Sequence, residues 1–522
     1  MKLSKISLPI LFTLFTATAF SQIPEDALKY SWGGPYGTAR NQAIGGAAGS
    51  LGGDISSLFV NPAGLGFYKT GELVFTPGFS MLKNKGDFRG SSASDSKTAF
   101  NLGATGFVLG FGSGKPNHSG AFSIGVARTA NFNSNISYKG ENNFSSYGEQ
   151  YAAEVAGSGL SLNDVLNSNS VSLQSRMAVY TYLVDTLTIP GRPSPDVISM
   201  SMWNSFKTGG TAFRVLQENH VESSGGTTDL AIGYASNSND KLYIGGSLGI
   251  PIVSYQKQVT FRESDPSGNN NNNFDYSELK ETYTTKGVGF NLKLGVIYKP
   301  ADQIRLGLAL HSPTIYGLKD TYESTMTTNT ENYPPSPGLV TVSSSLFTNG
   351  TAAEYKYDLV TPWKAMISGA YVFQEVADVT QQKGFVTADI EYVNYKSNRY
   401  STAEDNDDNS YYDGVNSAIK DYYKGAFNFR VGGELKFTTI MARLGFAYYG
   451  NPYKDSELKA DKKYVSAGVG YRNKGIFIDL TYVLALNNKD VNFPYRLSDK
   501  ENTFATIRGT GGNLGLTFGF KF

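Results

Sequence analysis

The chain lacks cysteine altogether, has only three histidines among its 522 residues, and carries charge on just 17% of them. Without cysteine it can form neither disulfides nor thiolate metal sites. A net charge of +1 gives no basic surface of the kind that nucleic-acid binding requires. No window offers about 18 uninterrupted apolar residues, which argues against membrane-spanning helices. We therefore expect no nucleic-acid partner, no metal and no cofactor.

Aromatic residues and glycine are abundant instead, with 34 Tyr, 32 Phe and 58 Gly. At the N-terminus, Lys2 and Lys5 precede an apolar run over 6–20 and a small-x-small site at Ala19–Ser21. This pattern predicts an export signal over 1–21; a membrane anchor is the alternative, but the run is short for a spanning helix. An exported, cysteine-free chain rich in aromatics and glycine is typical of outer-membrane β-barrels.

Alternation of apolar with polar or small residues supports that class. In the last strand one face carries Leu514, Leu516, Phe518, Phe520 and Phe522, and similar alternation recurs along the chain. A lipid-exposed strand alternates in this way over roughly ten residues. A full pass predicts about fourteen strands, over 70–83, 97–112, 119–139, 225–236, 240–262, 276–299, 303–325, 352–374, 383–399, 424–437, 439–450, 461–472, 475–487 and 503–522.

The connections between these strands are mostly short after even strands and longer after odd ones. The longest covers about 140–224. Short periplasmic turns and long extracellular loops are the asymmetry of an outer-membrane barrel, and an even count places both termini on the periplasmic side. The sequence thus predicts an all-β, antiparallel transmembrane barrel over 70–522, in the outer membrane of a Gram-negative bacterium.

Residues 22–69 precede the first strand and are too irregular for a strand and too glycine-rich for a stable helix. A fourteen-strand barrel is wider than an eight-strand one, which its own side chains fill, and narrower than the porins, which hold an open channel. Something must then occupy the lumen if the protein is not a leaky pore. We expect 22–69 to fold into it as a plug.

The segment GTARNQAIGGAAGSLGGDISSLFVNPAGLG, residues 37–66, resembles the N-terminal hatch of the FadL family of outer-membrane transporters for long-chain fatty acids and other hydrophobic compounds. The resemblance rests on a small-residue run containing Asp54, followed by Asn61, Pro62, Ala63 and Gly64. It implies passive uptake through an extracellular apolar groove, a lumenal pocket, a movable hatch and a side exit at a kinked third strand. The chain is expected to act as a monomer, and its final strand, ending at Phe522, to engage the barrel-assembly machinery.

Apolar side chains gather in the long loop. MAVYTYLV places residues at helical spacing, and ISMSMWNSF adds a second apolar stretch with Ile198. These helices either pack on each other as a cap over the barrel or share a ligand groove, for which methionine-rich surfaces are well suited. The groove candidates are Met177, Tyr180, Leu183, Val184, Met200, Met202, Trp203 and Phe206.

The third strand breaks the pattern at Arg128. Phe122, Ile124 and Val126 face lipid, and the same parity points Arg128 outward, where an unpaired charge is costly. Either Arg128 snorkels near the interface, or a bulge resets the register. We predict a bulge or kink between Val126 and Asn133, which makes Arg128 the candidate for the lateral exit.

Charged side chains are also predicted inside the barrel. Most are expected to pair with one another or to brace the hatch, and a basic one among them is an alternative receptor for a ligand carboxylate. These lumenal charges are Lys293, Arg305, Asp389, Glu391, Arg430, Glu434 and Arg443.

The sequence also leaves other functions open. The acidic run 403–414 is a solvated extracellular loop or, less favoured, a calcium site. His118, His220 and His311 are too few and too scattered for us to expect an enzyme, since His311 and Ser312 lie on opposite strand faces. The main alternative to transport is escort of cargo in type IX secretion by a FadL-like barrel, because fold alone does not separate the two. A porin for polar solutes requires an open lumen and no hatch.

Overall fold

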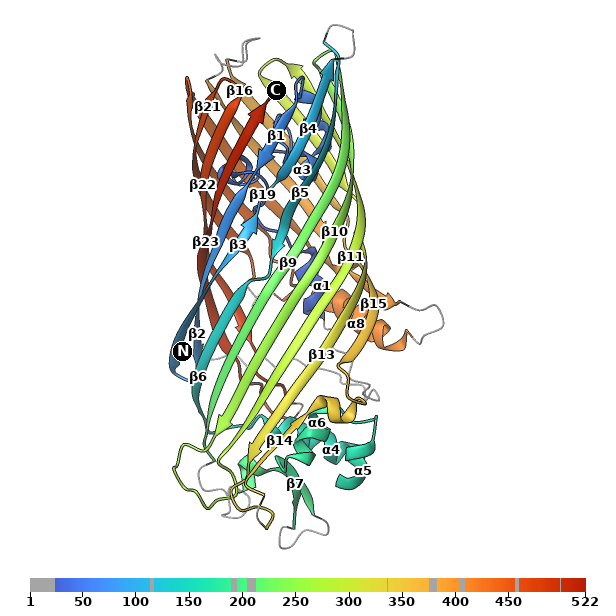
Figure 1. Cartoon of the computed structure of the whole chain (residues 1–522), viewed down its shortest axis with the longest axis vertical. Coiled ribbons are helices and arrows are strands. Elements are labelled where there is room, and N and C mark those ends of the chain that lie inside the picture. The colour runs from blue at the N-terminus through green and yellow to red at the C-terminus, as the bar shows by residue number, and fades with distance from the viewer. Residues whose placement is uncertain are drawn as a thin grey trace.

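The computed structural model describes residues 24–112, 117–188, 195–203, 213–335, 337–374, 383–403, 409–455, 460–497 and 499–522. It is a closed antiparallel barrel of fourteen strands, as the sequence predicts (Figure 1). The last strand pairs with the first, which closes the sheet into a cylinder. The expected export signal over 1–21 lies outside the described residues.

Six of the fourteen wall strands are split in two. The split strands are β1 (Glu72–Phe75) with β2 (Pro77–Phe88), β3 (Ser91–Leu102) with β4 (Thr105–Gly112), β5 (Ser119–Asn131) with β6 (Ser134–Asn142), β12 (Ile304–His311) with β13 (Ile315–Asn329), β15 (Ala353–Val360) with β16 (Lys364–Phe373), and β17 (Gly384–Asn394) with β18 (Arg399–Thr402). The others are β9 (Val215–Ser238), β10 (Leu242–Ser264), β11 (Tyr276–Ala301), β19 (Gly425–Phe437), β20 (Ile440–Tyr449), β21 (Lys462–Asn473), β22 (Ile476–Asn492) and β23 (Ala505–Lys521).

The two faces of the wall follow the predicted alternation. On β22, Ile478 and Leu480 are exposed whereas Asp479 and Thr481 are fully buried. Exposed apolar side chains on a closed barrel form the lipid-facing belt, and the buried polar ones face the lumen. Trp363, at the break between β15 and β16, is also exposed, as interfacial tryptophans are.

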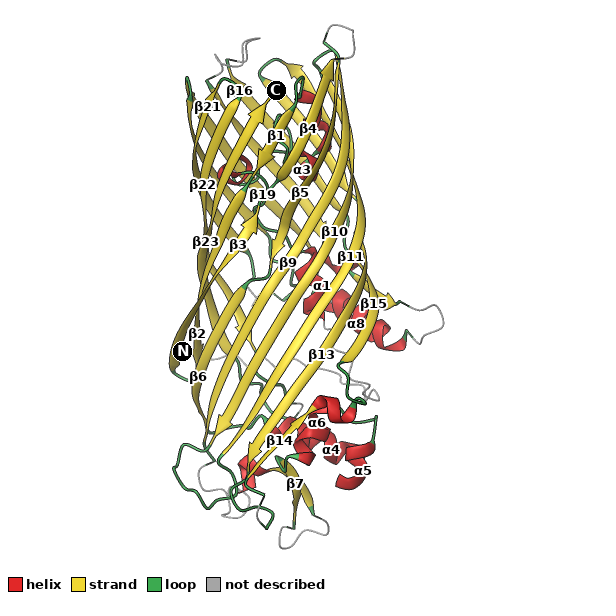
Figure 2. Cartoon of the chain, viewed as in Figure 1, coloured by secondary structure: helices red, strands yellow, loops and turns green. Residues whose placement is uncertain are grey.

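The two ends of the barrel differ. Short turns gather at the end where the C-terminus lies, whereas the helices and long loops gather mainly at the other end (Figures 1 and 2). The long connection after β6 contains α4 (Gly148–Ser158), α5 (Leu162–Asn167), α6 (Leu173–Tyr180), a β7–β8 hairpin (Val184–Leu187, Asp196–Ser199) and η2 (Met200–Met202). Other connections carry β14 (Leu339–Ser343), η3 (Ser344–Phe347), η5 (Tyr395–Ser397) and α8 (Ser410–Tyr422). Within the described ranges, the helices are all too short or too polar to cross a bilayer.

The N-terminal segment lies inside the barrel. It comprises α1 (Pro24–Ser31), α2 (Ala39–Ala43), α3 (Ser57–Val60) and η1 (Pro62–Phe67). The short helix α2 contacts β20 to β23, and η1 contacts β5 and β9 to β11, so this segment bridges the lumen from wall to wall. Residues 24–67 are called the hatch below.

Two features of the long connection differ from the sequence prediction. Strand β9 begins at Val215 rather than near 225, which shortens the loop. The expected helical spacing through Val184 is also wrong, because α6 ends at Tyr180 and Tyr182 adopts a positive φ of 60°. That turn sends Val184 into β7, where it pairs with Ser199 of β8, so Ile198 also lies on a strand.

Candidate functional site

Glycines on the inner face of the wall receive the hatch. A Cβ atom on Gly295 would lie 1.8 Å from Asn61 Oδ1, and one on Gly432 would lie 2.3 Å from the Ile44 carbonyl oxygen. Such distances leave no room for any side chain. Gly245, Gly307, Gly445 and Gly468 meet other hatch residues in the same way. We call these six residues the seat glycines. These glycines were not predicted from the sequence. Strand alternation nevertheless places them on the inner face, next to the charged lumenal positions, and could have indicated them.

The Asn61–Gly64 stretch is the part of the hatch that enters these seats. Asn61 Nδ2 donates to the Gly49 carbonyl at 2.6 Å, and Asn61 Oδ1 accepts from the Ala63 amide at 3.2 Å, which caps η1. Pro62 occupies the first turn of η1, where its missing amide proton costs nothing. The Gly64 carbonyl accepts from the Gly53 amide at 3.1 Å. The stretch therefore joins the two ends of the hatch loop as it meets the wall.

Asp54 braces the hatch internally. Its carboxylate accepts from Thr38 Oγ1 at 2.8 Å and from the Ser56 amide at 2.8 Å. Thr38 is the N-cap of α2, with its side chain accepting from the Asn41 amide. Asp54 thus links the start of α2 to the start of α3, the two elements that contact opposite parts of the wall.

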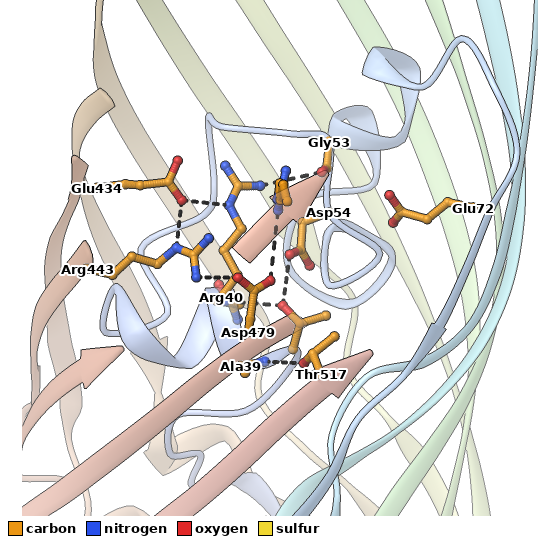
Figure 3. Close-up of polar contacts among 12 residues, drawn as sticks. Ala39, Arg40, Gly53, Asp54, Glu72, Glu434, Arg443, Asp479 and Thr517 are labelled. Carbon is orange, nitrogen blue, oxygen red and sulfur yellow. Dashed lines mark hydrogen bonds and ion pairs between the residues drawn. The ribbon is translucent and has the colours of Figure 1, made fainter. Parts of the chain in front are cut away.

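A buried ion network joins the hatch to the wall (Figure 3). Glu434 accepts from Arg443 Nε at 2.6 Å and from Arg40 Nε of the hatch at 3.4 Å. Arg443 also donates to Asp479 Oδ1 at 2.6 Å. Beside this network, the Ala39 amide donates to Thr517 Oγ1 at 2.8 Å. Asp479 lies on the inner face, as strand alternation predicts, whereas Arg40 was not among the predicted lumenal charges.

The remaining lumenal charges form separate pairs. Arg430 lies 3.2 Å from Glu391 and 3.8 Å from Asp389, whose carboxylate also accepts from the Gly49 amide of the hatch at 3.2 Å. Lys293 pairs with Asp229 at 2.9 Å. The seven predicted charges are therefore partnered, and several of their partners belong to the hatch.

Arg305 contacts the hatch through a backbone carbonyl and an aromatic ring. Its Nη1 donates to the Leu51 carbonyl at 2.5 Å, and its guanidinium lies 4.7 Å from the centre of the Phe67 ring. His311 makes a similar contact, with Nε2 at 2.9 Å from the Val60 carbonyl oxygen. Basic side chains of the wall thus hold backbone oxygens of the hatch.

The third strand contains the predicted irregularity. The register between β5 and β9 shifts between Arg128 and Ala130, and the strand breaks before β6 begins at Ser134. The prediction of a bulge between Val126 and Asn133 is confirmed. Arg128 lies over Gly226 of β9, where a Cβ would come within 2.8 Å of its Nη1. Within the described part of the chain, β5 beyond Val126 pairs only with β9, and β4 ends its ladder with β5 at Thr105.

The predicted groove residues lie mainly in the interior of the extracellular cap. Met177, Leu183, Val184, Met200 and Trp203 are buried together with residues of α4 and α6. Tyr180 is 41% exposed, and Met202 is half-buried. Phe206 lies outside the described residues, as do Asp405, Asp407 and Asp408 of the acidic run. In the part of the chain that the structure describes, no group of three or more His, Asp or Glu side chains is placed to hold a metal ion.

Helix α1 occupies the lumen between the cap and the rest of the hatch. Its Ala27, Leu28 and Tyr30 are buried among tyrosines of the wall and of α8. Tyr30 also packs edge-to-face against Phe132, at the break in the third strand, with ring centres 5.9 Å apart. Sequence reasoning placed the plug correctly but missed this tyrosine-rich chamber, whose members are spread over several distant strands.

Comparisons with known proteins agree with this architecture. No protein-family model matches the chain, and no curated protein sequence matches it. Among solved structures, a FadL homologue from Pseudomonas aeruginosa is similar over 94% of this chain and 100% of its own length, with 13% identity and a TM-score of 0.55. A deletion mutant of the TodX monoaromatic hydrocarbon channel is similar over 93% of this chain and 98% of its own length, with 14% identity and a TM-score of 0.51. The chain therefore has the fold of the FadL-type outer-membrane transporters.

Proposed function

We propose that this protein belongs to the FadL family and carries hydrophobic molecules passively across the outer membrane. The observation that carries the proposal is the occupied lumen: a fourteen-strand wall whose bore is filled by a hatch seated on glycines and held by buried ion pairs. An open porin for polar solutes does not fit a filled bore. An apolar solute needs only a protected route past the polar outer leaflet, since it dissolves in lipid on its own. We propose no enzymatic activity.

The proposed route begins at the extracellular cap. Exposed Tyr180 and half-buried Met202 are the first contacts, and the buried groove residues become available when the cap loosens. The ligand then replaces α1 in the tyrosine-rich chamber. It leaves sideways at the break in the third strand, beside Arg128, when the hatch shifts. Long-chain fatty acids or similar apolar compounds are the proposed ligands.

Identification of bound lipids tests the proposal directly. The mature protein is purified in detergent, extracted with organic solvent, and the extract is analysed by mass spectrometry. We expect a stoichiometric apolar ligand. Absence of any apolar ligand together with large ion conductance would point to a porin, and stable co-purification with secretion machinery would favour the escort role in type IX secretion.

An engineered disulfide tests movement of the hatch, because the chain has no native cysteine that could form competing disulfides. A Cβ on Gly49 would lie 2.9 Å from Ser368 Cβ on β16, and a disulfide needs about 3.8 Å, so a shift of roughly one ångström is enough to join cysteines there. We expect Gly49→Cys/Ser368→Cys to lose uptake of a labelled fatty acid when oxidised and to regain it on reduction. The Ser368→Cys single variant is the control. Equal uptake by the oxidised and reduced forms would contradict gating by the hatch.

A further inference from the structure

The barrel wall continues well past its lipid-facing belt. On β10 the outward side chains are apolar up to Ile252, and beyond it they become Ser254, Gln256, Gln258, Thr260 and Arg262. The outward faces of β9 and β11 change in the same way beyond Leu230 and Val288. The extracellular part of this wall therefore stands outside the hydrocarbon layer.

The second strand leaves the wall in this region. Among the residues that the structure describes, β3 pairs only with β2, and β6 pairs only with β9. Inward-parity side chains of β3 nevertheless contact outward-parity side chains of β6 and β9: Asp95 bonds Ser137 at 2.7 Å, and Lys97 pairs with Glu222 at 2.6 Å. The extracellular half of β3 thus lies over the outer surface of the barrel.

This overlap creates a groove of about 290 Å³ on the outer face. Ala93 of β3 lines it on one side, and outward side chains of four neighbouring strands line the rest, among them Ser137, His220, Thr260, Arg262 and Glu278. Neighbouring strands of a regular sheet leave no such hollow, so the groove is a consequence of the displaced strand.

Most residues that line the groove are of polar type and their charges are close to balanced, and aliphatic parts of these side chains form most of its accessible surface. Arg262 lies 3.7 Å from Glu278 and stacks on the Tyr276 ring at 3.7 Å, and Lys139 lies 4.0 Å from Glu218. Because each of these cations has an acid beside it, the groove is not a site for a bare anion. Hydroxyl and imidazole groups over aliphatic surface match a sugar, whose hydroxyls both donate and accept and whose C–H faces are apolar.

The geometry of the same residues argues against a hydrolytic active site. Ser137, His220 and Asp95 resemble a catalytic triad, but Ser137 Oγ lies 2.8 Å and Asp95 Oδ2 lies 3.4 Å from the same ring nitrogen, Nδ1 of His220. A triad needs the serine and the acid on different ring nitrogens. His220 Nε2 has no partner within the described ranges and is available to a ligand.

The height of the groove above the hydrocarbon layer indicates which part of a membrane glycolipid could reach it. Thr260 is eight residues beyond Ile252, so it lies about 26 Å farther along the strand at ~3.3 Å per residue. With a strand tilt of roughly 40°, this is about 20 Å above the hydrocarbon layer. Phosphates of an outer-leaflet glycolipid sit next to the hydrocarbon, whereas its sugar chain extends outward through this height.

We propose that this groove binds the oligosaccharide chain of the glycolipid in the outer leaflet. The contact holds the sugar chain against the tall side of the barrel and is independent of ligand transport through the lumen. A second protein as the occupant of the same surface would instead leave the free oligosaccharide unbound.

Soluble oligosaccharide provides the probe. The full mature protein, delipidated in detergent, is titrated by calorimetry with the oligosaccharide that mild acid releases from lipopolysaccharide. We expect saturable binding that weakens at least about tenfold, roughly 1.4 kcal/mol, in Thr260→Trp, which fills the groove. Thr325→Trp is the matched control, because Thr325 faces outward on β13 in the same cross-strand row as Thr260, outside the groove. Each variant must first migrate as a compact barrel in an unheated gel.

The proposal is overturned by the absence of binding to the wild-type protein, by equal binding to Thr260→Trp and the wild type, or by stronger binding to lipid A micelles than to the oligosaccharide. Equal loss in Thr260→Trp and Thr325→Trp would also contradict it, because the effect would then not belong to the groove. His220→Ala and Arg262→Ala provide milder variants, each expected to weaken binding by a factor of a few.

Discussion

At the residue scale, the lumen is held by charge pairs that cross between the hatch and the wall. Glu434 accepts from one arginine of the wall and one of the hatch and is fully buried. A buried pair of this kind adds little net stability over an apolar one, but removal of one partner leaves an uncompensated charge. Such residues therefore determine the position of the hatch in the lumen more than they determine the stability of the barrel.

The Glu434→Gln variant tests this reasoning. Loss of the carboxylate leaves Arg443 and Arg40 without their shared acceptor, which costs about 3–5 kcal/mol when a buried pair is broken. We expect the compact gel form to unfold at a clearly lower temperature. The matched control is Glu354→Gln in the exposed pair with Lys319, worth roughly 0–1 kcal/mol. Equal effects in the two variants would show that the Glu434 pair is effectively solvated.

Gly295→Ala tests the seat glycines. The added methyl group would overlap Asn61 Oδ1, so the hatch must move away from β11, at a cost of about 1–3 kcal/mol for overpacking. We expect a raised ion conductance in planar bilayers with the barrel intact. Gly246→Ala is the control, since a Cβ there meets its nearest atom at 3.4 Å. Unchanged conductance in Gly295→Ala would mean that the seat is adaptable.

Wall residues were predictable because strand alternation is a local property. Leu480 and Asp479 are assigned to opposite faces by their neighbours alone, and the structure confirms both. The contact of Asn61 with Gly295 was not predictable in the same way, because it joins residues more than 200 positions apart. The turn at Tyr182, which ends the expected helix, depends on the β7–β8 pairing and has no strong local signal.

At the element scale, the second and third strands are joined differently from the rest of the wall. Side chains such as Lys97 and Glu222, rather than a backbone ladder, hold β3 against β6 and β9. The kink itself was predicted from the parity of Arg128. The displacement of β3 was not predicted, because a strand that lies over the outside of the wall has the same alternation of side chains as a strand within the wall.

This junction should loosen in acid. The hydrogen bond and charge of Lys97 lower the pKa of Glu222 below its ordinary value of 4.5. A depressed pKa means that the contact is fully present above the unfolded value and is lost as the pH falls through the folded value. We expect spin labels on Ser94→Cys and Glu141→Cys to show a broader distance distribution at about pH 3 than at about pH 7. In a Glu222→Gln background the distribution should be broad at both; a narrow, unchanged distribution would contradict the role of this pair.

At the scale of the whole molecule, the hatch converts a wide barrel into a filled one. It contacts β5 and β9 to β11 on one side and β20 to β23 on the other. The sequence predicted a plug from the strand count and its place in the chain, and the resemblance of residues 37–66 pointed to the hatch. Neither indicated that α1 reaches the tyrosine-rich chamber.

Deletion of residues 22–60 tests the plug as a unit. In its periplasmic half the wall pairs with itself all the way round, so the truncated barrel should still form and still shift in mobility when heated. We expect its bilayer conductance to rise well above that of the full protein. Conductance equal to that of the full protein would mean that other segments seal the bore.

The position of the hatch also has a consequence for biogenesis. The segment that touches both early and late strands is made before any of them, and its α2 can settle only where the last four strands stand. The final seam, between β23 and the first strand, lies beside this segment, because α2 contacts β23. We therefore expect the hatch to guide closure of the barrel. Variants that unseat the hatch are expected to assemble slowly as well as to leak.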